Sequence, residues 1–295
     1  MSRYAITGQA PAGFVCLPPD PHPQPPAFEV PQGACDSHVH IFGSTDDFPH
    51  TNTRLFVPPL ATFEMYRAVQ TRLGLTRAVI VHPAVYGTAL ACTIDALRKA
   101  GGSWRAIALA DSSITAEEIE RLHGFGFRGI RVNFPDGGGN VQKLRQLAAR
   151  LAPFAWHAQL LITFDMLADL ESELQEIEIP LVVDHMGYSK ADIALNHPGF
   201  QALLRLLKNG RFWVKISGLD RVGSRELRYE DARRLADRLV QSNEDRVVWG
   251  TDWPHVRRRN IPNDGMLLNL LGEWISDAEV LRKILVDNPA HLYGF

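Results

Sequence analysis

The segment Cys35-Asp36-Ser37-His38-Val39-His40-Ile41-Phe42 is a short apolar stretch that carries two histidines near its end. Further short apolar segments follow it along the chain, and stretches with the apolar spacing of helices lie between them. One such stretch, 116–122, follows a Thr115/Glu118 capping box. We predict strands at 35–42, 77–83, 104–111, 127–134, 159–164, 180–186, 211–217 and 246–253. Strands that alternate with helices predict a parallel sheet.

These strand segments predict a barrel. Each is almost continuously apolar, as expected when both faces of a parallel strand are buried, and eight such units favour closure. The alternative, an open doubly wound sheet, would carry a glycine-rich phosphate turn after its first strand, and none is present. We therefore predict an α/β fold of the (β/α)8 TIM-barrel class, which needs about 250 residues.

Residues 1–33 differ from the remainder in composition. The run Pro18-Pro19-Asp20-Pro21-His22-Pro23-Gln24-Pro25-Pro26 cannot form a helix or a central strand, because proline lacks the N–H and fixes φ. We predict an extended proline-rich N-terminal arm over 1–33 and one barrel domain over 34–295.

Composition excludes several classes of partner. The formal net charge is −2, so no field of one sign indicates nucleic acid or a membrane surface. No apolar run reaches the ~18 residues of a membrane helix, and no signal peptide is evident. Three widely spaced cysteines indicate neither disulfides nor a zinc ribbon. We expect a cytoplasmic protein that is a monomer or a small homo-oligomer.

Polar side chains gather at the ends of the predicted strands. In a barrel, the residues that do chemistry lie at the C-terminal ends of the strands, and packing alone does not explain this distribution. The residues at these ends are His38, His40, His82, Arg131, Asn133, Thr163, Asp165, Asp184, His185, Ser217, Asp220, Arg221, Thr251, Asp252 and His255.

The pair His38-x-His40 is the sharpest of these features. Residues i and i+2 of a strand point to the same face, so both imidazoles are aimed together. On their own they could equally be two half-buried histidines with hydrogen-bond partners. Asp252, on the last strand, would lie beside the first strand after closure, and a carboxylate beside two histidines can orient and deprotonate a water. We therefore predict catalysis by His38, His40 and Asp252.

Other strand ends predict the remainder of the site. His185 is expected to act with this group, whereas the preceding Asp184 is expected to turn outward. His82 and His255 are as consistent with binding substrate as with structural roles. Arg131 and Arg221 predict an anionic substrate, because a guanidinium fork matches carboxylates and other oxyanions, although each could instead pair with a local acid.

Four motifs together resemble the amidohydrolase superfamily, and within it the 2-pyrone-4,6-dicarboxylate hydrolase branch. The resemblance covers 33–295. Its motifs are His38-Val39-His40-Ile41-Phe42-Gly43, Val183-Asp184-His185-Met186-Gly187, Trp249-Gly250-Thr251-Asp252-Trp253-Pro254-His255 and Asn288-Pro289-Ala290-His291-Leu292-Tyr293-Gly294.

The resemblance implies a lactone hydrolase of aromatic-compound catabolism. It implies that Asp252 activates water, that His38, His40 and His185 surround the substrate carbonyl, and that the two arginines bind anionic groups. His82, Thr163 and His255 complete the expected substrate contacts. The chain departs from the branch at Asp136-Gly137-Gly138, where a basic residue is expected, and at Phe56 and Thr163, where tyrosines are expected.

These departures leave the anionic lactone open. A sulfonated muconolactone fits at least as well as the pyrone dicarboxylate. The alternatives are an aldarolactone isomerase, a zinc-dependent decarboxylase of aromatic acids and a non-catalytic binding barrel.

The sequence favours hydrolysis without a metal. His38, His40, Asp252 and His185 could hold one Zn²⁺ in an open site. The superfamily's usual strand-five histidine is absent, however, and strand four has no lysine to bridge two metals. We expect no cofactor, with one Zn²⁺ as the alternative.

Overall fold

The computed structural model describes residues 13–51, 56–135, 140–190, 195–226 and 228–295. The departure from the branch at Asp136-Gly137-Gly138 and the start of the arm at 1–12 lie outside these ranges. Within the described ranges, none of the helices is both long enough and apolar enough to cross a bilayer.

Parallel strands that alternate with helices give the (β/α)8 barrel topology, as predicted. In the sheet, the strands follow one another in chain order, from β2 through β4 and onward to β10. The observed strands are shorter than the predicted segments, because the chain turns into loops where the polar residues begin. Their bounds are β2 Cys35–Val39, β4 Arg77–Val81, β5 Trp104–Ala108, β6 Phe127–Asn133, β7 His157–Leu161, β8 Leu181–Val183, β9 Phe212–Ile216 and β10 Val247–Trp249.

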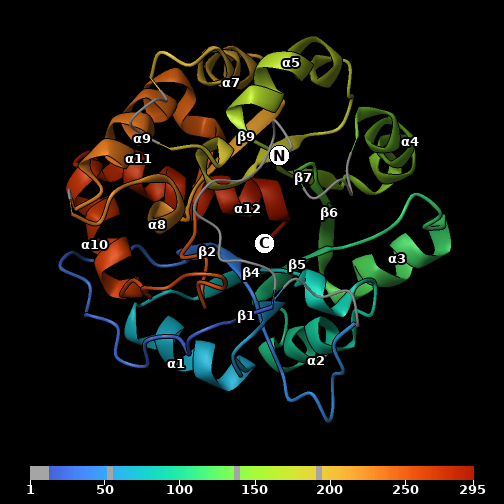
Figure 1. Cartoon of the computed structure of the whole chain (residues 1–295), viewed down its shortest axis with the longest axis horizontal. Helices are drawn as coiled ribbons and strands as arrows, with labels where there is room; N and C mark the ends of the chain where they lie inside the picture. The colour runs from blue at the N-terminus through green and yellow to red at the C-terminus, as the bar shows by residue number, and fades with distance from the viewer. Residues whose placement is uncertain (1–12, 52–55, 136–139, 191–194, 227) are drawn as a thin grey trace. The chain divides into compact units, whose positions relative to one another are not determined.

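The chain divides into two compact units. The N/C unit contains the described residues up to Leu109, Gly124–Phe127 and Trp249–Phe295, and the middle unit contains Ala110–His123 and Arg128–Val248. In the N/C unit, α2 packs against β5 (Figure 1). This unit also holds the short parallel pair β1 (Phe14–Val15) and β3 (Phe56–Val57). Its helices are α1 Phe63–Arg72, η1 Ala84–Tyr86, α2 Ala91–Ala100, α10 Asp264–Trp274, α11 Ala278–Arg282, η5 Lys283–Asp287 and α12 Asn288–Tyr293.

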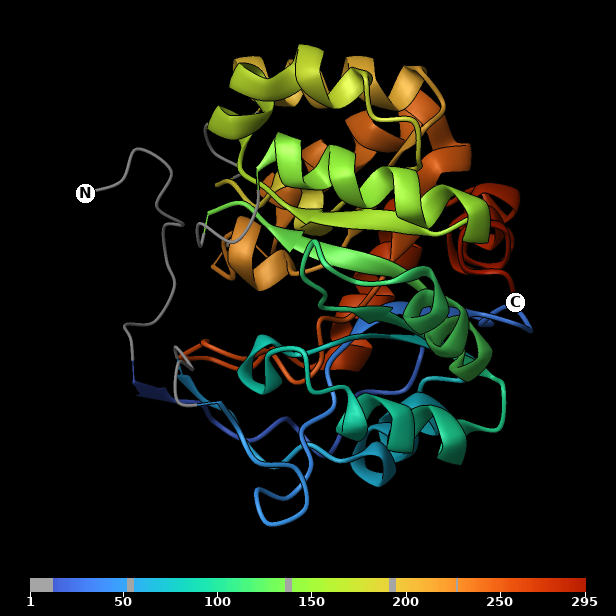
Figure 2. The same cartoon turned by 90° about the vertical axis from the view of Figure 1, so that its right-hand side faces the viewer.

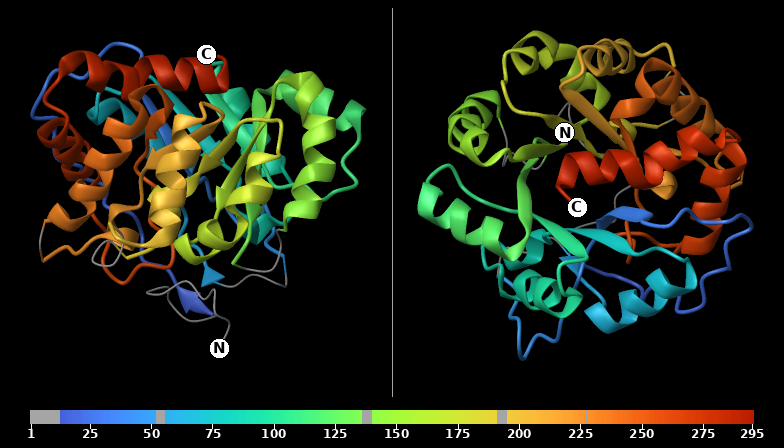
Figure 3. Two further views of the ribbon diagram at one scale, coloured as in Figure 1. Left: turned by 90° about the horizontal axis from the view of Figure 1, so that it is seen from above. Right: turned by 180° about the vertical axis from the view of Figure 1, so that it is seen from behind.

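Helices in the middle unit cover its strands. The apolar face of α4 packs on β7 (Figure 2), and α5 and α7 lie side by side (Figure 3). Residues Ala116–His123 of the helix α3 (Ala116–Phe125) also belong to this unit. The others are α4 Val141–Leu151, η2 Ala152–Phe154, α5 Phe164–Gln175, η3 Asp184–Gly187, α7 Pro198–Lys208, α8 Leu219–Val222, α9 Glu230–Asn243 and η4 Glu244–Arg246.

The described part of the arm is extended, as predicted. No helix or strand forms between Cys16 and Ala34. Prolines 19 and 23 are buried, and backbone groups of this segment bond to side chains of α10 and its N-cap. The proline run therefore packs on the N/C unit.

Candidate active site

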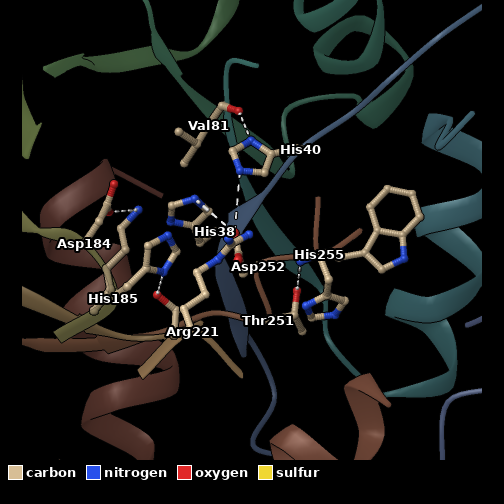
Figure 4. A network of polar contacts seen from close by, with 12 residues as sticks. His38, His40, Val81, Asp184, His185, Arg221, Thr251, Asp252 and His255 are labelled. Atoms are coloured by element: carbon tan, nitrogen blue, oxygen red, sulfur yellow. Dashed lines mark hydrogen bonds and ion pairs between the residues drawn. The ribbon is translucent and has the colours of Figure 1, made fainter. Parts of the chain in front are cut away.

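Two histidines of β2 and its end face one carboxylate. Nε2 of His38 lies 3.7 Å from Asp252 Oδ1, and Nε2 of His40 lies 3.6 Å from the same oxygen. The two rings are edge to face, with centroids 5.0 Å apart. All three side chains are buried, and Figure 4 shows both rings turned toward Asp252. The i, i+2 spacing therefore gives the convergence that the sequence predicted.

The orientation of His40 is fixed by its other nitrogen. Nδ1 lies 2.7 Å from the Val81 carbonyl, which can only accept, so Nδ1 carries the proton (Figure 4). In the neutral ring, the lone pair of Nε2 then faces the Asp252 carboxylate. Two groups of negative character that converge in a buried place suit a proton or a cation between them.

Backbone hydrogen bonds join β2 to the chain that follows β10. The Asp252 N–H donates to His38 O at 2.9 Å, and the His40 N–H donates to Trp253 O at 2.8 Å. Asp252 has a φ of +69°, a left-handed conformation that non-glycine residues seldom adopt. The strand end therefore holds Asp252 between the two histidines.

Asp36 stabilises this junction through hydrogen bonds, although no role was predicted for it. Its buried carboxylate accepts four hydrogen bonds, from the N–H groups of His38 and Thr251 and from the hydroxyls of Tyr66 and Thr251. Burial raises the pKa of Asp36 to about 6, against the opposing effect of these donors. The one available signal was its position two residues before His38, on the same strand face.

Two further histidines in the N/C unit have fixed local partners. His82 Nε2 donates to Gly87 O at 3.1 Å, and its Nδ1 lies 2.8 Å from Thr93 Oγ1. Burial lowers the pKa of His82 to about 4, so the ring is neutral at pH 7. His255 is wholly buried, and its Nε2 lies 2.9 Å from Asp264 Oδ1. Sequence reasoning missed Asp264, because nothing in a loop-to-helix segment indicates that contact.

In the middle unit, His185 in η3 and Arg221 in α8 are both buried. His185 Nδ1 lies 2.9 Å from Ser217 Oγ. A Cβ at Gly218 (φ +60°) would stand only 2.7 Å from the same ring nitrogen, so this close approach requires glycine. Arg221 donates from Nη1 to the Tyr188 hydroxyl at 3.2 Å.

Asp184 does not turn outward, so that expectation was wrong. Its carboxylate is fully buried, 3.3 Å from Lys215 Nζ and 3.4 Å from Arg131 Nε. Lys215 is also completely buried and donates to Gln159 Oε1 at 2.8 Å. An ionised side chain survives burial only when paired, and here one carboxylate serves two cations. Lys215 could not be recognised from the sequence, because it lies inside the otherwise apolar strand β9.

Thr163 and Asp165, the two polar residues predicted at the end of strand five, lie in different environments. Thr163 precedes α5 as its N-cap residue and is buried, and its Oγ1 makes no hydrogen bond within the described residues. Asp165 instead lies on α5 with its side chain half exposed, 3.4 Å from His197 Nε2. The helix α5 begins at Phe164, the last residue of the predicted strand, so Asp165 lies on the helix with its side chain half exposed rather than at a strand end.

Among the described residues of the N/C unit, one group of side chains could hold a metal ion. Ligand atoms of His38, His40 and Asp252 lie within 4.8 Å of one another, and all three residues are buried. Two imidazoles and one carboxylate are a donor set that suits Zn²⁺ and leaves a position open for water. The residues therefore fit a single zinc ion.

Comparison with known proteins places this geometry in a family. The chain is 34% identical over 288 residues to a 4-sulfomuconolactone hydrolase of Hydrogenophaga intermedia, covering 95% of this chain and 94% of that protein. It is 32% identical over 285 residues to a 2-pyrone-4,6-dicarboxylate hydrolase of Comamonas testosteroni, covering 92% and 93%. The crystal structure of a probable 2-pyrone-4,6-dicarboxylic acid hydrolase from Acinetobacter baumannii, with citric acid bound, superposes with a TM-score of 0.78 at 25% identity. That match covers 90% of this chain and 100% of the other.

The family model described as Amidohydrolase matches residues 35–295, which begin at the first residue of β2 and include every strand of the barrel. The chain therefore belongs to the amidohydrolase family.

Proposed function

We propose that this protein hydrolyses a small anionic lactone, with Asp252 as the general base. The observation that carries the proposal is the buried convergence of Asp252 with His38 and His40. The names of its relatives support the substrate class, since both act on anionic lactones. The catabolism of aromatic compounds is a setting that would supply such lactones. That the protein is cytoplasmic, and that it is a monomer or a small homo-oligomer, stay predictions.

The proposed reaction begins with a water held at Asp252. Asp252 accepts one proton from this water while the oxygen adds to the lactone carbonyl carbon. The ring C–O bond then breaks, and the departing oxygen takes up the proton that Asp252 had accepted. The products are an alcohol or enol and a carboxylic acid, which loses its own proton to solvent at neutral pH. Histidines 38, 40 and 185 are proposed to stabilise the oxyanion; one preorganised donor contributes on the order of 3 kcal/mol.

Two arginines are proposed to hold the anionic groups of the substrate. Arg221 is buried, its Nη1 donates to the Tyr188 hydroxyl, and its planar guanidinium matches carboxylates and other oxyanions. Arg131 shares Asp184 with Lys215, so this group of three carries a net positive charge. His82, Thr163 and His255 are proposed as further substrate contacts.

A zinc ion is the alternative to hydrolysis without a metal. It would be held by His38, His40 and Asp252, with His185 as the fourth residue that the sequence suggested, and it would supply Lewis-acid activation of water. Metal analysis of protein purified without added zinc, with activity measured after chelation, decides between the two. Full activity at zero metal excludes the zinc alternative, whereas activity proportional to bound zinc excludes hydrolysis without a metal.

The decisive experiment is a screen of anionic lactones for ring opening, followed in the ultraviolet. It includes the pyrone dicarboxylate and a sulfonated muconolactone, with products identified by NMR. A ring-opened acid supports the proposal. An isomeric lactone would indicate an isomerase, release of CO2 a decarboxylase, and binding without turnover a non-catalytic barrel.

The Asp252→Asn variant tests the assigned base. Loss of a general base costs about 100- to 10,000-fold in kcat. We expect a loss in this range with an unchanged circular-dichroism melting curve. Near-normal turnover would contradict the assignment.

A further inference from the structure

Asp264 is a fully buried carboxylate in contact with His255. It is the first residue of α10, and its Oδ1 lies 2.9 Å from His255 Nε2, with both side chains 0% exposed. A carboxylate oxygen accepts from a ring N–H, so in this contact Nε2 is the donor and Asp264 Oδ1 the acceptor. The neutral ring then has Nδ1 as its acceptor. Asp264 therefore determines both the orientation and the tautomer of His255.

His255 is in turn tied to Asp252. The His255 N–H donates to the Asp252 carbonyl at 2.9 Å. A ligand nitrogen of His255 and a carboxylate oxygen of Asp252 also lie within 4.8 Å of one another. Both residues have positive φ, +63° and +69°, so this turn is held by its surroundings rather than by local preference.

The proline-rich segment 20–30, called here the strap, holds the start of α10. Asn263 is the N-cap of this helix, and its Oδ1 accepts from the N–H groups of Met266 and Gln24. Its Nδ2 donates to Asp20 Oδ2 and to the His22 carbonyl. One side chain thus starts the helix and binds the strap at the residue directly before Asp264.

The strap is bound again farther along α10. The Asn269 side chain accepts from Ala27 N at 2.7 Å and donates to Pro25 O at 3.1 Å, so both of its polar atoms are used on strap backbone. A Cβ at Gly265 would stand 1.9 Å from Gln24 O, and one at Gly272 would stand 2.6 Å from the Phe28 ring. The helix therefore provides both hydrogen bonds and space for the strap.

We propose that Asp264 is a positioning residue for the reaction, that it acts through His255 on Asp252, and that the strap secures Asp264 by fixing the start of α10. The proposal rests on the proposed function insofar as Asp252 is taken as the base.

The first test replaces Asp264 by asparagine. Its matched control is Asp165→Asn, which alters an exposed His–Asp pair with His197 in the middle unit. We expect D264N to lower kcat by about 10- to 100-fold with little change in KM, because misplacement of a reacting group acts on the transition state. The nitrogen-15 shifts of the His255 ring, assigned by comparison with His255→Gln, should report a changed tautomer. D165N should leave kcat and those shifts at wild-type values.

The second test loosens the strap alone. Asn269→Ala removes both of its backbone contacts without removing a helix cap, whereas Asn140→Ala removes the cap of α4 and has no strap contact. We expect N269A to increase amide exchange in 20–30 and at the start of α10, and to lower kcat by about 3- to 10-fold. N140A should lower Tm but leave kcat unchanged.

These outcomes separate the two proposals. If D264N keeps wild-type kcat, or if N269A frees the strap without any effect on kcat, the positioning role is overturned while lactone hydrolysis stands. If no lactone is opened by the wild type, the proposed function fails, and the His255 ring shifts and the amide exchange still decide whether Asp264 and the strap fix that ring.

Discussion

Lys215 and Asp184 are the two buried charges of the middle unit whose removal should be most informative. Lys215→Met removes one of the two cations that contact the Asp184 carboxylate, and breaking a buried ion pair costs on the order of 3 kcal/mol of stability. The double variant Lys215→Met/Asp184→Asn removes both charges, and we expect it to recover part of this loss. Urea unfolding measures both variants. A double variant less stable than K215M would show that Asp184 is needed for reasons other than this pair.

At this scale, motif residues were predictable and their partners were not. The i, i+2 rule aimed His38 and His40 together, and the strand-end rule gathered Asp252 with them. The prediction that Asp184 turns outward was wrong, because β8 is only three residues long. His185 and Met186, which follow it, have positive φ, so the side-chain alternation of a strand does not continue through them. Asp264 could not be found, since its contact with His255 depends on how α10 is seated.

At the scale of elements, Asp36 ties β2 to the chain after β10, and its burial makes this tie dependent on pH. Its pKa is about 6 in the folded protein and 3.8 ordinarily, so the folded state holds a proton that the unfolded state has lost. The contribution to stability is fully present below pH 3.8 and is lost as the pH rises through about 6. The loss amounts to on the order of 3 kcal/mol.

The Asp36→Asn variant isolates this effect. Between pH 4 and pH 7, the unfolding free energy of the wild type should fall by on the order of 3 kcal/mol relative to that of this variant. Tyr66→Phe is the matched variant, because it removes one donor from the carboxylate and should raise the Asp36 pKa further. A constant difference between wild type and D36N over this range would show that Asp36 does not titrate there.

The positions of the strands could be predicted because each apolar segment ends where polar residues begin. Their lengths could not, since Thr163 and Asp184 belong to turns and helices that start before the hydrophobic pattern ends. The arm was predicted to be extended from proline chemistry alone. Its packing on α10 depends on hydrogen bonds to Asn263 and Asn269. These residues are about 240 positions farther along the chain, so no local sequence pattern indicates the contact.

For the whole molecule, alternation of strands and helices was enough to predict the barrel, because periodicity reports burial in every segment at once. Stability against acid is a property of the same scale, since histidines buried in both units oppose protonation. Burial, with the charge of Lys215, lowers the pKa of His157 to about 3, and burial lowers that of His82 to about 4. Both rings are therefore neutral in the folded protein at pH 5.

The sign of the pH dependence follows from these values. Each histidine has a lower pKa folded than unfolded, so its contribution to stability is complete above about pH 6.5 and is lost as the pH falls toward 4 or 3. At pH 5 each ring should cost about 2 kcal/mol relative to pH 7. Asp36 opposes this loss, because its folded form takes up a proton near pH 6. The net acid destabilisation is therefore smaller than the two histidines alone would give.

His157→Gln tests this account without touching the candidate catalytic residues. Glutamine keeps a polar group beside Gln159 but has no proton to bind in the unfolded chain. Between pH 7 and pH 5, the wild type should lose about 2 kcal/mol more than the variant in urea unfolding. Parallel pH profiles for the two proteins would mean that His157 takes up its proton in the folded state as readily as in the unfolded chain.

The His82→Gln variant should flatten the profile to a similar degree, because the same desolvation acts on a ring in the other unit.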